Sequence, residues 1–205
     1  MNRAELKTWV KEKIKGHRMQ LLGAILVTSI LTSLTVGQKY SFDESTGFTV
    51  TGGVPLGIFF YFVNVGFAYY MVKFLNNKEY NFKDLFHFSK DYVRTLLTGL
   101  LEAVFVLLWT LLLIIPGIIK TIAYSLVTLI LADEKYNKLS YMEILKKSEA
   151  MMKGHKMDFF VLQLSFIGWH LLAILTLGIL EIWIIPYQTT ATYKFLDDVM
   201  KNYKE

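Results

Sequence analysis

Four ionisable side chains lie inside long apolar stretches of this sequence: Glu102, Lys120, His170 and Glu181. A charge near the centre of a membrane-spanning helix costs roughly 3 kcal/mol, so such a residue usually faces protein or water and has a partner. Glu102 lies about 12 Å beyond Arg94 along a helix, which makes it the most deeply placed acid of the chain. These four residues are the candidates for intramembrane chemistry.

Two interpretations of this set stay open. Lys120, His170 and Glu181 would reach a similar depth near the outer face, where they would form a polar cluster on a transport pathway. Alternatively, Lys120 and Glu181 form a pair that locks two helices, and His170 is hydrogen-bonded to the backbone.

The sequence contains no motif for other kinds of chemistry. The sequence has no Cys, no H-E-x-x-H zinc motif, no G-x-S-x-G nucleophile turn and no G-x-x-x-x-G-K phosphate loop. His87 and Asp91 share a helical face but have no third metal ligand. We therefore expect no catalytic residue, no metal site and no cofactor. A membrane hydrolase is disfavoured because no nucleophile has an adjacent base.

Composition places the chain in a membrane. Hydrophobic residues make up 54% of its 205 residues and charged residues only 19%, whereas soluble domains are about a quarter charged. A span needs about 20 apolar residues. The apolar stretches predict six spans, near Met19–Val36, Leu56–Val72, Val93–Leu111, Ile114–Leu131, Met157–Leu177 and Leu180–Phe195.

The basic residues predict an orientation. Twenty of the 22 lysines and arginines fall in four segments, at 3–18, 73–94, 135–156 and 194–204. An even number of spans puts all four segments on one side, which the positive-inside rule identifies as the cytoplasm. The net charge of +5 is therefore explained by topology, and we expect no nucleic-acid partner.

A repeated pentapeptide indicates internal repetition. Lys15-Gly16-His17-Arg18-Met19 recurs as Lys153-Gly154-His155-Lys156-Met157, each time between an amphipathic segment and an apolar one. Capping-box spacing precedes each amphipathic segment, at Asn2/Glu5, Asn81/Asp84 and Ser140/Glu143. We predict an all-α domain, 1–205, of three parallel repeats at about 1–79, 80–138 and 139–205. Each would be an amphipathic helix followed by a helical hairpin, with both termini cytoplasmic.

The amphipathic segments carry lysines opposite an apolar stripe. One interpretation is that they lie at the cytoplasmic interface and contact anionic head groups. The other is that they pack under the bundle as structural elbows. The candidate head-group contacts are Lys7, Lys11, Lys15, Arg18, Lys146, Lys147, Lys153 and Lys156.

The first outer loop, 37–53, alternates aromatic and polar residues around Ser45-Thr46-Gly47. This pattern is typical of a short β-hairpin. An irregular polar loop is the alternative.

Several segments resemble a known family. They are Ile114-Ile115-Pro116-Gly117-Ile118-Ile119-Lys120, Tyr124-Ser125, Ile130-Leu131-Ala132-Asp133, Leu164-Ser165-Phe166-Ile167-Gly168-Trp169, Leu175-Thr176-Leu177-Gly178 and Pro186-Tyr187. They are similar to a bacterial integral membrane family, domain of unknown function nine hundred and seventy-five, itself distantly similar to the membrane domains of some glycerophosphodiester phosphodiesterases. The resemblance implies a multi-pass protein of the bacterial plasma membrane. It implies no catalytic residue, because we expect a chain of this length to have no room for the soluble phosphodiesterase part.

These observations favour a non-enzymatic membrane protein that engages lipid, or a membrane-protein partner, through its cationic amphipathic helices. The alternative is a small transporter or channel that uses the intramembrane polar residues.

Overall fold

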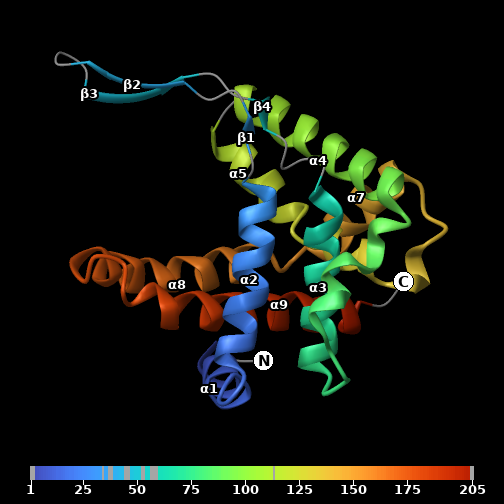
Figure 1. The fold of residues 1–205 in the computed structure, drawn as a ribbon. Coiled ribbons are helices and arrows are strands. Elements are labelled where there is room, and N and C mark those ends of the chain that lie inside the picture. The colour runs from blue at the N-terminus through green and yellow to red at the C-terminus, as the bar shows by residue number, and fades with distance from the viewer. Residues whose placement is uncertain are drawn as a thin grey trace.

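Helices make up most of the chain in the computed structural model, which describes residues 3–33, 35–36, 39–43, 47–51, 54–55, 60–112 and 114–203. The elements before the middle of the chain are α1 (Arg3–Lys13), α2 (Arg18–Thr32), α3 (Tyr61–Leu75), the 3-10 helix η2 (Phe82–Ser89) and α4 (Tyr92–Leu112) (Figure 1). The elements after it are α5 (Ile114–Ala123), α6 (Val127–Ala132), the 3-10 helix η3 (Glu134–Tyr136), α7 (Tyr141–Met151), α8 (Lys156–Leu175) and α9 (Glu181–Asn202).

Two short antiparallel strand pairs interrupt this helical pattern. Strand β1 (Thr35–Val36) pairs with β4 (Val54–Pro55), and β2 (Lys39–Asp43) pairs with β3 (Gly47–Thr51). The second pair sets Phe42 opposite Phe48, as the hairpin interpretation of the outer loop requires. Its turn, 44–46, lies outside the described residues.

Three helical segments are long and apolar enough to cross a membrane: Tyr92–Thr110, Ile115–Ala132 and Lys156–Leu175. Helices α2 and α3 have 15 residues each, which corresponds to about 22 Å of helix against a hydrocarbon layer of about 30 Å. The predicted fourth span matches the second of these segments, although α5 ends at Ala123 and α6 begins at Val127 within it. Helix α9, at the predicted sixth span, has 22 residues but is not among these segments. Among the described residues, three of the six predicted spans therefore match a segment that is both long and apolar enough to cross a membrane.

The helical hairpins are not all aligned. Helices α2 and α3 lie side by side, whereas α9 packs across α1, α2 and α3 (Figure 1). The hairpin formed by α8 and α9 projects beyond α2, so its tip at 176–180 lies away from the other helices. Sequence periodicity cannot reveal such a crossing, because it reports which face is apolar and not how two hairpins are oriented.

The repeated pentapeptide forms the same turn twice. Gly16 and Gly154 have φ of +85° and +90°, a left-handed conformation that glycine adopts without a steric penalty. His17 and His155 follow with φ of −107° in both. The preceding helices, α1 and α7, have 11 residues each. The first and third predicted repeats therefore share one helix–turn–helix geometry.

Burial follows the same correspondence. Six buried positions in α1, its turn and α2 correspond, at a constant offset, to six buried positions in α7, its turn and α8. They are Leu6, Val10, Ile14, Leu21, Ala24 and Thr28 in the first segment and Ile144, Ser148, Met152, Phe159, Leu162 and Phe166 in the second. The middle segment differs: no residue from 89 to 92 has a positive φ, and η2 replaces the α-helix.

The apolar stripes of α1 and α7 face the protein. Leu6 and Val10 of α1 are 2% and 0% exposed and belong to a core that also contains Phe74 and Leu162. Ile144 of α7 is fully buried in the neighbouring core. Helices α1 and α7 therefore pack against the protein with their apolar faces, as the structural-elbow interpretation expects. Only their polar faces are available to head groups.

Capping boxes begin two of these segments. The Asn81 side chain accepts from the N–H of Lys83, and Asp84 accepts from the N–H of Asn81 at 2.7 Å. Glu143 accepts from the N–H and the hydroxyl of Ser140 at 2.8 and 2.7 Å, and these hydrogen bonds lower the pKa of its carboxyl. The third predicted box includes Asn2, which lies outside the described residues.

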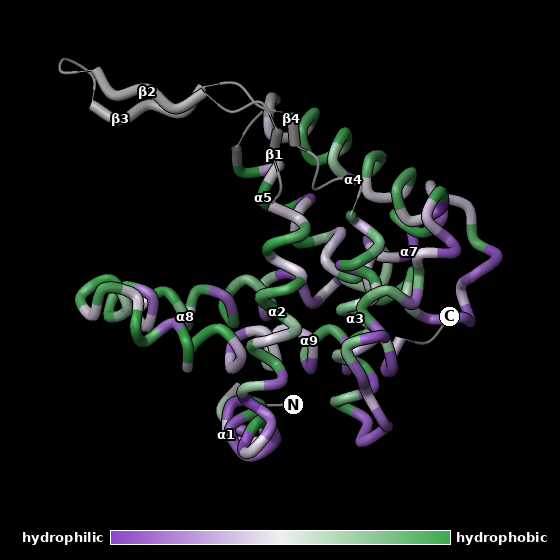
Figure 2. Tube along the Cα trace, in the orientation of Figure 1, coloured by the Kyte–Doolittle hydropathy of each residue, from purple (hydrophilic) through white to green (hydrophobic). Residues whose placement is uncertain are grey.

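Large apolar side chains are left on the outside. Along α4 an exposed stripe runs at helical spacing and comprises Val93, Leu97, Leu100, Val104, Leu107 and Leu108. The inner side of the same helix buries Thr95 and Thr98 instead. Hydrophobic residues also predominate at the projecting end of the α8–α9 hairpin (Figure 2). The side chains of Leu175 and Leu177 there are 80% and 94% exposed. Large exposed apolar surfaces are typical of sites that contact a membrane or a protein partner.

The close approach of α3 to η2 gives a stability prediction. A Cβ on Gly66 would stand 2.0 Å from the carbonyl oxygen of Leu85, whereas a Cβ on Gly168 would meet nothing within 4 Å. Gly66→Ala should therefore destabilise the protein by about 1–3 kcal/mol through overpacking. Gly168→Ala should be neutral or stabilise α8 by up to about 1 kcal/mol. Thermal unfolding in detergent measures both, and equal melting temperatures for the two variants would contradict the packing.

Candidate functional site

Glu102 contacts α3. The hydroxyl of Tyr61, in the first turn of α3, donates to Glu102 Oε2 at 2.8 Å. Gly99, one turn before Glu102, lies under the Tyr61 ring, where a Cβ would stand 2.7 Å from the ring. The missing side chain at Gly99 lets the ring reach the carboxylate, so this acid has a hydrogen-bond partner between two helices.

Lys120 pairs with Glu149 and not with Glu181. Its Nζ lies 2.8 and 3.0 Å from the Glu149 carboxylate oxygens and 5.2 Å from the centre of the Trp109 ring. The expected Lys120–Glu181 pair is wrong because α5 packs against α8, and Glu149 of α7 lies within reach of Lys120. Glu181 begins α9, at the opposite end of the α8–α9 hairpin from the α7–α8 turn.

His170 and Glu181 do meet, as part of a polar ladder between α8 and α9. His170 Nδ1 lies 2.8 Å from Glu181 Oε1, and its Nε2 lies 2.6 Å from Gln188 Oε1. The Gln188 amide donates to Gln163 at 3.0 Å, and the Gln163 amide donates to Thr192 at 2.9 Å. Hydrogen bonds of this kind hold helices together in an apolar environment. The ladder explains why these polar residues occur in apolar helices.

The four predicted intramembrane residues thus occupy three separate contacts. Glu102 binds Tyr61, Lys120 binds Glu149, and His170 binds Glu181. In the part of the chain that the structure describes, no group of three His, Asp or Glu residues is arranged to hold a metal ion.

The cations of the first repeat converge on one hollow. Lys7, Lys11, Lys15 and Arg18 line a hollow of about 590 Å³ together with Trp169 and Trp183 of the α8–α9 hairpin. We call it the Arg18 hollow. Its remaining lining residues are Thr8, Ile14, Ile184 and Tyr187. The two tryptophans were not predicted, because their meeting with α1 depends on the crossing of the hairpins.

The candidate cations of the third predicted repeat do not converge. Lys147 lies over the rings of Tyr136 and Tyr203, 5.7 and 5.2 Å from their centres. Lys156 lies 4.0 Å from Glu149, and Lys153 lines a different hollow. Lys146 is exposed on the outer side of α7. Lys153 and Lys156 stand at the positions of Lys15 and Arg18, but Leu145 and Glu149 stand at those of Lys7 and Lys11, so the two segments differ in charge as well as in surroundings.

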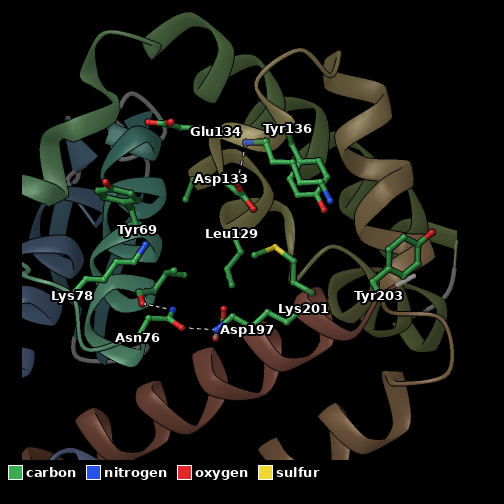
Figure 3. A pocket seen from close by; sticks show the side chains of 14 residues that line it. Tyr69, Asn76, Lys78, Leu129, Asp133, Glu134, Tyr136, Asp197, Lys201 and Tyr203 are labelled. Carbon is green, nitrogen blue, oxygen red and sulfur yellow. Dashed lines mark hydrogen bonds and ion pairs between the residues drawn. The ribbon is translucent and has the colours of Figure 1, made fainter. Parts of the chain in front are cut away.

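A second, larger hollow of about 800 Å³ lies where α3, α6, η3 and α9 meet (Figure 3). Lys201 donates to both Asp197 and Asn76 at 2.6 Å, and the second carboxylate oxygen of Asp197 is buried without a hydrogen-bond partner. Both acidic and basic side chains line it, among them Asp133 and Lys135. No sequence motif marks this hollow, because three segments that are distant in sequence form it: α3, the α6–η3 segment and α9.

The pairing of Lys120 can be tested with a double-mutant cycle. Lys120→Met and Glu149→Gln should be coupled by about 0.5–1 kcal/mol, because both side chains are partly exposed and their attraction is screened. Lys120→Met and Glu181→Gln should be additive within about 0.5 kcal/mol. The free energies of unfolding of the single and double variants in detergent measure both. Coupling in the second pair alone would restore the rejected Lys120–Glu181 contact.

The comparisons with known proteins give a family and no function. No curated protein and no solved structure matches the chain. The family model described as "Protein of unknown function (DUF975)" matches residues 1–122 and 110–203. The two matches together extend over almost the whole chain, so the chain belongs to this uncharacterised family.

Proposed function

We propose that this protein is a non-enzymatic, multi-pass membrane protein that binds anionic lipid head groups through the polar faces of its cationic helices. The observation that carries the proposal is the combination of an exposed apolar stripe on α4 with cationic helices whose apolar faces are buried. The stripe supports contact with acyl chains. Lys11 of α1 and Lys146 of α7 are exposed, and Lys7 and Lys147 are partly exposed, so attraction to head groups would be electrostatic and would not need insertion.

The proposed threading has three helical hairpins that each start and end on the lysine-rich side. Six spans result when all three hairpins cross the bilayer. A hairpin returns to the side from which it started, whether it crosses the bilayer or lies along the head-group layer. The lysine-rich connectors would therefore stay on the same side even if α8 and α9 lie along that layer. The bacterial plasma membrane, with an anionic inner surface, is the proposed location.

Transport is the weaker candidate. It would need Glu102, Lys120, His170 and Glu181 to share an aqueous path, and their three separate hydrogen-bonded contacts support a role in holding helices together instead. A distant relation to phosphodiesterase membrane domains is compatible with the lipid proposal, and no phosphodiesterase activity is proposed.

The orientation can be tested directly because the chain has no cysteine of its own. Lys11→Cys and Lys153→Cys should react with a membrane-impermeant maleimide in inside-out vesicles and not in intact cells. Lys39→Cys, in β2, should show the reverse. The extent of labelling before and after detergent addition measures accessibility. Labelling of the Lys153 variant from the same side as the Lys39 variant would refute the threading.

The lipid proposal predicts a dependence on charge. The combined change Lys7→Gln, Lys11→Gln, Lys146→Gln and Lys147→Gln should weaken the enrichment of anionic over zwitterionic lipid around the protein, since each lysine near an anionic surface contributes about 1 kcal/mol at low salt. Quantifying the lipid co-purified from mixed vesicles measures this enrichment. Arg at the same four positions is the control and should preserve it. If the Gln variant and the unmodified protein retain equal amounts of anionic lipid, the proposal fails.

A further inference from the structure

We propose that the Arg18 hollow binds the phosphate head group of a single anionic phospholipid, with the tryptophans of the α8–α9 hairpin against its glycerol and upper acyl region. This inference rests on the proposed function and adds a specific site to it. The site joins the first repeat to the last, because α1 and the α1–α2 turn supply the cations and α8 and α9 supply the aromatic wall.

The charge in the hollow is of one sign. Lys7, Lys11 and Lys15 are spaced by four residues, so they project from one side of α1 and its turn, and Arg18 follows at the start of α2. None of the described residues that line the hollow is acidic. This distinguishes it from the hollow of Figure 3, where Asp197 and Asp133 accompany the lysines. An anion is therefore the ligand that the Arg18 hollow fits.

Arg18 distinguishes the cations of this hollow. It is the one guanidinium among the described residues that line it. A guanidinium matches two phosphate oxygens with two parallel hydrogen bonds, which an ammonium group cannot do. Arg18 is thus placed as the anchor for a phosphate, with the lysines contributing charge around it.

The aromatic wall favours a lipid over a free anion. Trp169 and Trp183 are about half exposed, at 50% and 48%. Tryptophan is enriched where a membrane protein meets the head-group layer, because its ring is apolar and its N–H is polar. Ile14 and Ile184 extend the apolar lining. Inorganic phosphate would use the cations and leave this wall uncovered, whereas a phospholipid uses both.

The third repeat provides a control within the same molecule. Lys153 and Lys156 stand at the positions of Lys15 and Arg18 in an identical turn. There, Lys156 lies 4.0 Å from Glu149 and lines an apolar hollow with Met157 and Phe160. Each turn carries two cations, but Leu145 and Glu149 stand where the first segment has Lys7 and Lys11, and only the first turn has an arginine that shares a hollow with tryptophans. Changes at the two turns should therefore have unequal effects.

The experiment is native mass spectrometry of the purified full chain in detergent, with phosphatidylglycerol and phosphatidylcholine added in equal amounts. We expect one phosphatidylglycerol molecule to be retained at collision energies that remove bulk lipid. Arg18→Gln should lower that retention roughly tenfold, as expected for loss of charge-assisted hydrogen bonds. Trp169→Leu with Trp183→Leu, which leaves the charge unchanged, should lower it several-fold, and Lys153→Gln with Lys156→Gln by less than about twofold.

Three results would overturn the site. Equal losses from the first and third turns, with no effect of the tryptophan change, would mean that surface charge alone attracts lipid; the proposed function would stand and the site would not. Displacement of the lipid by inorganic phosphate at low millimolar concentration would identify a free-anion site. Failure of the unmodified protein to prefer phosphatidylglycerol would refute the proposed function itself. Lys11→Gln with Lys15→Gln, at exposed positions, serves as the second variant if Arg18→Gln does not fold, and should also lower retention.

Discussion

The arrangement of the described helices depends on one constraint: buried polar groups need hydrogen-bond partners within or between helices, while many large apolar side chains lie on the outer surface. Thr28, Thr98 and Thr190 are buried, and each donates its hydroxyl to the carbonyl four residues earlier at 2.7–2.9 Å. A hydroxyl satisfied within its own helix can be buried at low cost. Small hydroxyl-bearing residues and glycines therefore pack at helix contacts beside buried leucines and isoleucines, and further leucines and isoleucines lie on the outer surface.

This constraint explains why the ionisable residues are paired and separated. Within an apolar medium each charge or strong hydrogen-bonding group needs a local partner, and Tyr61, Glu149 and Gln188 supply partners on three different helices. Each pair fixes one helix contact. Glu102 fixes α4 on α3, Lys120 fixes α5 on α7, and His170 fixes α8 on α9. The sequence left open whether these polar residues line a pathway or lock helices together; in the structure each of them makes a contact between neighbouring helices.

Features that depend on neighbouring residues could be predicted from the sequence. The helical stripes, the Asn81/Asp84 and Ser140/Glu143 boxes and the turn at Gly16 and Gly154 all follow from local patterns, and the structure contains them. The partner of Lys120 was predicted incorrectly because the depth of a residue was inferred from its distance along a span, which assumes parallel hairpins. The α8–α9 hairpin crosses α2. Periodicity contains no information about that crossing, so Trp169 and Trp183 could not be assigned to the Arg18 hollow.

The same crossing makes two nearly identical turns unequal. In the first repeat, α1 and its turn lie against α9, so their cations face another hairpin across a hollow. In the third repeat, α7 packs on α4 and α6, and its turn lies beside α5 and its exposed isoleucines. The repeated pentapeptide thus supplies the same backbone turn with two cations twice, while the charges of the preceding helices and the neighbouring elements differ between the copies. At the second copy Lys156 stands where the first has Arg18, and it lies 4.0 Å from Glu149. An ammonium group beside a carboxylate acts as a point charge, whereas a guanidinium makes directed hydrogen bonds, so the two copies differ in the ligand that they can hold.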